Sequence, residues 1–154
     1  NYKTITAACQ SGGHSIIAES PIDINLAKQL NILILDMGFP LERIVMHPAT
    51  GALGYGLEYT YSIMERSRLA ALQGDRMMSM PMVNFVGQEV WRAKEAKTSE
   101  QEAPQWGPIA SRGPLWEVTT AVSYLQAGAD ILVMCHPKAI ESVKKTIKEL
   151  MQKE

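Results

Sequence analysis

Residues 43–59, RIVMHPATGALGYGLEY, carry the pattern on which the fold prediction depends. A short run with Ile44 and Val45 ends at His47 and Pro48, three glycines follow within six residues, and a helical pattern then begins. The run is too short for a typical helix, and its β-branched residues favour a buried strand. The stretch therefore predicts one strand–loop–helix unit, with the glycine loop at the carboxyl end of the strand.

The same kind of run recurs along the chain. Short apolar segments of strand length occur at residues 4–9 (TITAAC), 43–47 (RIVMH), 80–86 (MPMVNFV) and 130–135 (DILVMC). Continuous apolar runs of this length are typical of parallel strands covered on both faces. The sequence therefore predicts four buried parallel strands.

A helical pattern follows each predicted strand. Ser20 is the predicted N-cap of the first helix, ahead of a proline and an aspartate in its first turn. Later helices are expected at about residues 57–73, 113–127 and 140–151, from apolar residues at helical spacing. Glycine ends three of these patterns just before the next strand, at Gly38, Gly74 and Gly128.

This alternation predicts an α/β fold of the (βα)4 type in one domain, residues 1–154. The spacing is close to that of a (βα)8 TIM barrel, and a small open doubly wound sheet is the alternative. Residues 87–111 form a long polar insertion with a helical turn near residues 89–96. A connection of this length is either a functional lid or partner-facing segment, or a flexible excursion.

Composition excludes several classes of protein. The 154 residues are 46% hydrophobic with a formal net charge of -1, so nothing indicates nucleic-acid binding. No apolar run approaches the roughly 20 residues that span a membrane. The separated cysteines Cys9 and Cys135 are expected to be buried free thiols in a reducing, cytoplasmic setting. Because the chain starts at Asn1, without a methionine and close to a predicted strand, we expect it to be a trimmed sequence or part of a longer protein.

The glycine loop is the main candidate for binding, because ligands of parallel α/β folds sit at the carboxyl ends of strands. Its spacing, G-x-x-G-x-G at Gly51, Gly54 and Gly56, is the reverse of the dinucleotide fingerprint. Three roles remain open on these grounds: phosphate binding at a helix N-terminus, a structural turn, or clearance for a bulky ligand or partner.

No residue set suggests catalysis or metal binding. His47 and His136 each precede a proline at a strand end, where a structural role is favoured over metal ligation. The charges at Glu65, Arg66 and Arg68 are expected to form a solvated or interface cluster. We therefore predict no catalytic residues and no metal site.

Several long segments together resemble one protein family: SPIDINLAKQLNILI, GALGYGLEYTYSIMERSRLAALQGDRMMSMPMV, WRAKEAK and LWEVTTAVSYLQAGADILVMCHP. The family is the small subunit of the corrinoid iron–sulfur protein, called the delta subunit in the archaeal acetyl-CoA decarbonylase/synthase complex. The resemblance covers essentially the whole chain. It implies the C-terminal half of a TIM (βα)8 barrel.

The resemblance implies an accessory subunit more than a stand-alone enzyme. In this family a large subunit holds the corrinoid (cobalamin) and a [4Fe–4S] cluster, and the small subunit's barrel mouth covers the corrinoid. The pair shuttles a methyl group from a methyl-tetrahydropterin or methyl-tetrahydrofolate to the nickel centre of acetyl-CoA synthase, in the Wood–Ljungdahl pathway of carbon fixation. Expected partners are therefore the large subunit, as a heterodimer, a pterin methyltransferase and acetyl-CoA synthase.

The chain agrees with this role in its motifs. It contains neither a D-x-H-x-x-G corrinoid-ligand motif nor a four-cysteine cluster motif, so no iron–sulfur cluster is expected in this chain. Thr50, Gly51, Gly54 and Asn84 are the residues predicted to face the corrinoid, and the glycine loop is then interpreted as clearance for that ring or its domain. The alternatives are a TIM-barrel methyltransferase that binds a pterin, for which Asn84 is the lone candidate, and a small nucleotide-binding domain.

Overall fold

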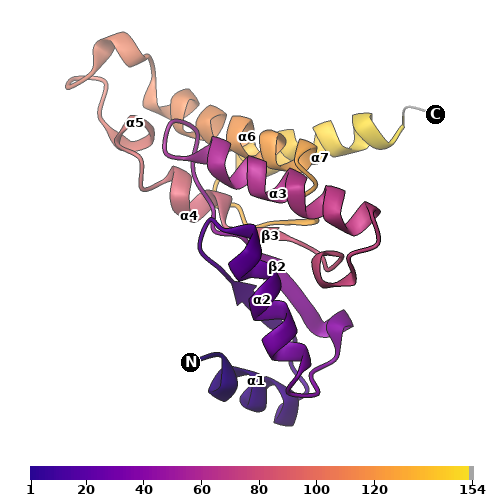
Figure 1. Ribbon diagram of the computed structural model, residues 1–154. Helices are drawn as coiled ribbons and strands as arrows, with labels where there is room; N and C mark the ends of the chain where they lie inside the picture. The colour runs from indigo at the N-terminus through magenta and orange to yellow at the C-terminus, as the bar shows by residue number, and fades with distance from the viewer. Residues whose placement is uncertain (153–154) are drawn as a thin grey trace.

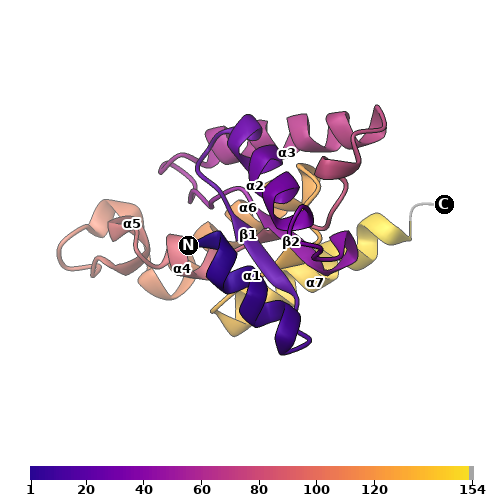
Figure 2. The same cartoon turned by 60° about the horizontal axis from the view of Figure 1, so that its bottom comes forward.

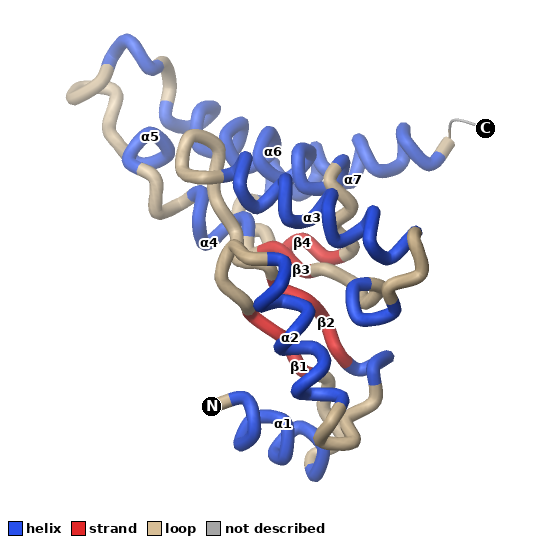
Figure 3. The backbone as a smooth tube through the Cα atoms, in the orientation of Figure 1, coloured by secondary structure: helices blue, strands red, loops and turns tan. Residues whose placement is uncertain are grey.

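Four parallel strands lie side by side in the order of the chain, in a computed structural model that describes residues 1–152. Strand β1 (Ile16–Glu19) pairs with β2 (Ile44–His47), from Ile16 opposite Ile44 to Glu19 opposite His47. A single parallel bridge between Met46 and Met82 joins β2 to the segment that leads into β3 (Val83–Asn84), and β3 pairs with β4 (Ile131–Leu132). Figure 3 shows these strands in red among the helices. The α/β prediction is confirmed.

Helices connect the strands and make up most of the chain (Figure 1). The long ones are α1 (Tyr2–Ser11), α2 (Ile24–Leu35), α3 (Leu57–Leu72), α6 (Ile109–Gln126) and α7 (Pro137–Met151). Shorter ones are α4 (Val86–Val90), α5 (Lys94–Lys97), η1 (Leu41–Arg43), η2 (Arg76–Met78) and η3 (Pro104–Trp106).

The predicted strand at residues 4–9 is wrong, because these residues lie in α1. The guanidinium of Arg43 donates to the carbonyl oxygen of Cys9, 3.1 Å away, near the end of this helix. Helix α1 also contacts α2 and β1, beside which Figure 2 shows it. These contacts override the β-branched composition of the segment, which is a weak preference. The first strand is β1, and the order is therefore a helix followed by four βα units.

The residues at which helices begin and end were mostly predicted correctly. Gly38, Gly74 and Gly128 have φ angles of 78°, 97° and 97°, a left-handed conformation that glycine tolerates. The N-cap of α2 is Asp23 instead of Ser20, since its Oδ1 accepts from the backbone nitrogens of Asn25 (2.7 Å) and Leu26 (3.1 Å). The backbone of Ser20 instead donates to the carbonyl of His47, which extends the β1–β2 pairing.

The insertion at residues 87–111 is packed against the fold. It contains α5 and η3, and α6 begins inside it at Ile109 instead of near Gly113. The buried guanidinium of Arg112 donates to three carbonyl oxygens, of Glu95, Thr98 and Gly107. One side chain thus holds the two halves of the insertion together.

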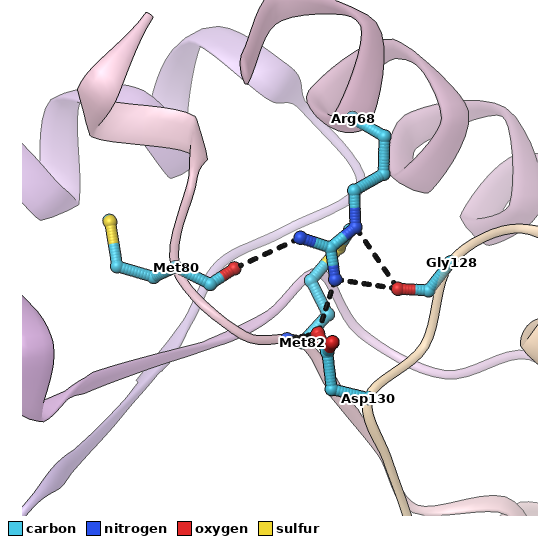
Figure 4. Close-up of polar contacts among 5 residues, drawn as sticks. All are labelled: Arg68, Met80, Met82, Gly128 and Asp130. Atoms are coloured by element: carbon cyan, nitrogen blue, oxygen red, sulfur yellow. Dashed lines mark hydrogen bonds and ion pairs between the residues drawn. The ribbon is translucent and has the colours of Figure 1, made fainter. Parts of the chain in front are cut away.

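An ion-pair cluster lies at the amino ends of β3 and β4 (Figure 4). The guanidinium of Arg68 on α3 donates to the carbonyl of Gly128, at 2.6 and 3.1 Å, to that of Met80, and to the carboxylate of Asp130. The same carboxylate accepts from the backbone nitrogen of Met82, 2.7 Å away. Of the two predicted roles, the solvated one is wrong for Arg68, whose side chain joins α3 to the residues ahead of β3 and β4, and an interface role for the cluster stays a prediction.

The two outer strands leave apolar surface uncovered. Along β1, Ile16 and Ala18 are buried whereas Ile17 and Glu19 are exposed. Within residues 1–152, β1 pairs only with β2, and β4 only with β3. Among the described helices, none is long and apolar enough to cross a membrane.

Candidate functional site

A polar pocket of about 340 Å³ lies at the carboxyl ends of β1 and β2. Glu19 and His47, the last residues of these strands, sit opposite each other in the pairing and both line the pocket. The remaining walls come from the loop after β2 and from the residues around α4: Ala49, Thr50, Phe85, Gln88, Glu89 and Arg92. We call this the rim pocket.

His47 is the buried centre of the rim pocket, with 7% of its surface exposed. Its Nε2 lies 3.0 Å from the Thr50 hydroxyl, which also accepts from the backbone nitrogen of Phe85 at 3.0 Å. The Phe85 ring meets the imidazole edge-on, with ring centres 4.9 Å apart. Within the described part of the chain, Nδ1 has no hydrogen-bond partner, and the Glu19 carboxylate is 3.9 Å away.

Burial lowers the pKa of His47 below its ordinary value of 6.5, and it outweighs the nearby carboxylates of Glu19 and Glu89, which raise it. The imidazole is therefore neutral at pH 7. A neutral ring carries one N–H and one acceptor nitrogen, so it can bind a ligand by hydrogen bonding without adding charge.

Ala49 is the strained residue of this wall. It has a φ of 60°, the one positive value among the described residues other than glycine. Such a conformation costs free energy for an L-amino acid, and strain of this kind concentrates at functional sites. It reverses the chain directly after His47 and Pro48, which brings Thr50 back to the imidazole.

The predicted site residues divide into different environments. Thr50 lines the rim pocket. Asn84 is fully buried at the end of β3, and neither atom of its amide group has a partner within residues 1–152. The structure thus places Thr50 at the pocket and encloses Asn84, whose role in binding stays a prediction.

Gly51 and Gly54 are explained by the loop itself. A Cβ on Gly51 would lie 2.5 Å from the backbone carbon of Gly56, so the close approach that requires glycine is internal to the loop. The hydroxyl of Tyr124 accepts from the nitrogen of Gly51 at 2.9 Å and donates to its oxygen at 2.5 Å. Gly54 has a φ of 77°. These observations support the structural-turn interpretation of the glycine loop, and contact with a cofactor stays a prediction for both residues.

Sequence reasoning missed Glu117, a fully buried carboxylate on α6. It accepts from the indole nitrogen of Trp91 (2.8 Å) and from the backbone nitrogens of Cys135 (2.6 Å) and His136 (3.1 Å). Its charge thus faces the start of α7, where the helix dipole favours an anion. Nothing in the apolar spacing of α6 distinguishes this glutamate from a solvent-facing one.

The two cysteines are free, but they differ from the prediction in burial. Cys9 is half-buried in α1, and Cys135 is exposed after β4. No group of three or more His, Cys, Asp or Glu side chains within residues 1–152 is arranged to hold a metal ion.

Comparison with known proteins supplies the family. A profile of the CO dehydrogenase/acetyl-CoA synthase delta subunit matches residues 1–99. The chain belongs to this delta-subunit family. It is 40% identical over 152 residues to the acetyl-CoA decarbonylase/synthase complex subunit delta of Methanopyrus kandleri, covering 99% of this chain and 37% of that protein.

Other delta subunits show the same relation. Identity is 38% over 157 residues with the protein of Methanocaldococcus jannaschii, covering 99% of this chain and 37% of the relative. Identity is 36% over 155 residues with the protein of Archaeoglobus fulgidus, covering 97% of this chain and 34% of the relative. The chain therefore spans little more than a third of the length of these delta subunits.

Proposed function

We propose that this chain is part of a non-catalytic subunit of a corrinoid iron–sulfur methyl carrier. The carboxyl ends of its strands cover a corrinoid that a large, [4Fe–4S]-carrying subunit holds. The observation that carries the proposal is a polar pocket at those strand ends, in a member of the delta-subunit family, with a buried histidine nitrogen that lacks a partner within residues 1–152.

The proposed architecture is the C-terminal half of a (βα)8 barrel. Parallel strands in chain order are the arrangement found in such barrels. A groove of about 480 Å³ runs beside β1, lined by residues that include Ile5, Ile17 and Leu30. Further strands of a longer subunit would cover this apolar surface and pair with β1 and β4.

The rim fits the edge of a corrinoid better than its face. A pocket of about 340 Å³ would admit a side chain of the ring, and it is small for the whole ring. His47, Thr50 and Glu19 would hold that side chain, and the loops around them would exclude water from the ring. When bound, the corrinoid supplies the cobalt that carries the methyl group.

This role defines the partners and the setting. The methyl group comes from a methyl-tetrahydropterin or methyl-tetrahydrofolate through a pterin methyltransferase, and it goes to the nickel centre of acetyl-CoA synthase. The protein would act in the cytoplasm, within the Wood–Ljungdahl pathway. Its own contribution is orientation and shielding of the cofactor.

A pair of matched variants tests the proposal. Gln88 at the rim and Gln126 at the end of α6 are both exposed. The measurements are association of the chain with the corrinoid-loaded large subunit, by sedimentation, and the rate at which cyanide replaces the ligand on cobalt. We expect the chain to slow this exchange, Gln88→Arg to weaken both effects, and Gln126→Arg to leave them unchanged.

Equal behaviour of the two variants, or no association of the chain with the large subunit, would contradict the proposal. Calorimetry with methyl-tetrahydrofolate adds a separate comparison. Tight binding of this pterin to the chain would favour the methyltransferase alternative.

A further inference from the structure

The rim pocket has a definite hydrogen-bonding character, set by the tautomer of His47. The Thr50 hydroxyl oxygen accepts from the backbone nitrogen of Phe85, so its own hydrogen is free to donate to a second partner. The tautomer that gives this hydrogen a partner makes the imidazole Nε2, 3.0 Å away, the acceptor nitrogen of the ring. In this tautomer the hydrogen of the neutral imidazole lies on Nδ1, the ring nitrogen that faces Glu19.

This Nδ1–H is an unused donor. Within the part of the chain that the structure describes, the atom is buried and has no hydrogen-bond partner. A buried donor without an acceptor destabilises the fold, so an acceptor supplied by a ligand would stabilise it. The Glu19 carboxylate is the nearest charged group, but 3.9 Å is too long for a hydrogen bond.

The charges around the pocket leave one carboxylate available. Arg92 pairs with Glu89 at 2.7 Å, so these two charges offset each other. Glu19 is paired only with the distant His47 nitrogen among the described residues, and its side chain is 73% exposed at the end of β1. It can change rotamer to meet a ligand, because no packing holds it.

We propose that the rim pocket binds a primary carboxamide. The carbonyl oxygen accepts from Nδ1–H of His47, and the amide NH2 group donates to the carboxylate of Glu19. The carbonyl oxygen and the NH2 group of the carboxamide then each have a hydrogen-bond partner, and the buried donor of His47 gains an acceptor.

Other ligand classes fit less well. A carboxylate would meet the like charge of Glu19. An ammonium group has donors only and would leave Nδ1–H unsatisfied. A carboxamide is neutral and presents one acceptor and two donors on adjacent atoms, which is the complement of the imidazole and carboxylate.

This inference rests on the proposed function and makes it more specific. The periphery of a cobalamin-type corrin ring carries primary amide side chains, and one of them would enter the rim pocket. The amide state of the ring, and not the cobalt, is then what this chain recognises.

The test compares two corrinoids on the chain in complex with the large subunit freed of its cofactor. The probes are dicyanocobinamide, which keeps its side-chain amides, and dicyanocobyrinic acid heptacarboxylate, which has carboxylates there. Dissociation constants are measured by quenching of tryptophan fluorescence. The large subunit contributes its own preference, so the quantity compared between variants is the ratio of the two constants.

Exposed positions supply the variants. We expect Glu19→Lys to shift the ratio toward the carboxylate probe by about tenfold, and Glu19→Gln to shift it in the same direction by less. Glu42→Lys is the control, since it makes the same charge change at the opposite, exposed end of β2, and it should keep the wild-type ratio. These outcomes would support the carboxamide site.

A ratio that is the same in wild type and Glu19→Lys, with dicyanocobinamide still bound, overturns the carboxamide site alone. Equal shifts with Glu42→Lys overturn it as well, because the effect is then one of overall charge. Failure of the wild-type complex to bind either probe overturns both this inference and the proposed function.

Discussion

The Arg68 cluster and the rim pocket lie at opposite ends of the parallel strands, and the polar groups at the two ends differ in whether they have hydrogen-bond partners. At the amino ends of β3 and β4, Arg68 and Asp130 are joined to each other and to the backbone of three further residues. At the carboxyl ends, His47 and Asn84 are buried with atoms that lack partners within residues 1–152. The first arrangement stabilises the fold, and the second is costly unless a ligand or a partner completes it.

The largest expected effect concerns Arg68. Arg68→Ala removes the donors for two carbonyls and the partner of Asp130, so we expect a loss of about 2–3 kcal/mol in the free energy of unfolding. Arg66→Ala is the control, at an exposed position of the same helix. Denaturant titration of both variants measures the difference. Equal stabilities would show that the amino-end cluster is not an anchor.

Glu117 sharpens the comparison, because it is a well-paired group at the carboxyl end of the sheet. Glu117→Gln replaces an acceptor oxygen by an NH2 group that faces N–H donors, and should cost about 2 kcal/mol. Glu65→Gln, on the exposed side of α3, is the matched control. The readouts are denaturant stability and the fluorescence of Trp91. If Glu117→Gln left the free energy of unfolding unchanged, the location of a polar group along the strands, and not its hydrogen bonds, would decide its effect on stability.

Substitution of Asn84 should raise the free energy of unfolding, whereas the two substitutions above should lower it. Asn84→Leu replaces an amide without partners among the described residues by an apolar group of similar volume, so we expect unfolding to cost about 1 kcal/mol more. Thermal unfolding of the two proteins provides the measurement. Lower stability of the variant would indicate that a bound water or another group satisfies the amide, and the contrast with the Arg68 cluster would weaken.

The smallest effect is a dependence of stability on pH. The pKa of His47 is lowered on folding, so the unfolded chain takes up the proton first as the pH falls below 6.5. The stability from the neutral imidazole is complete above pH 6.5 and is lost as the pH falls toward the pKa of the folded state, by at most about 1.4 kcal/mol per unit.

His47→Phe should flatten this part of the pH profile, measured by denaturant titration at successive pH values. His14→Phe makes the same change at an exposed position and should keep the wild-type profile. If the pH profile of stability of His47→Phe matched that of the wild type, groups other than His47 would cause the pH dependence.

Part of the site was predictable and part was not. The strand ending at His47 and the loop that holds Thr50 were evident from proline, glycine and β-branched residues, which act through local backbone geometry. The enclosed amide of Asn84 and the paired carboxylate of Glu117 were not. Glu117 is enclosed by Trp91, Cys135 and His136, which lie 18 to 26 residues away in the chain, and no local pattern encodes which distant residues cover a side chain.

The sequence by itself determined the α/β alternation, the left-handed glycines that end three helices, the family, and the position of a candidate site after β2. Tertiary structure decided three other things: that residues 4–9 are helical, that Arg68 is an internal anchor, and that Gly51 makes room for its own loop. The reason is the range of the interactions. Backbone conformation and periodicity act over a few residues, whereas the contacts of Arg68 with Gly128 and of Gly51 with Tyr124 join positions 60 and 73 residues apart.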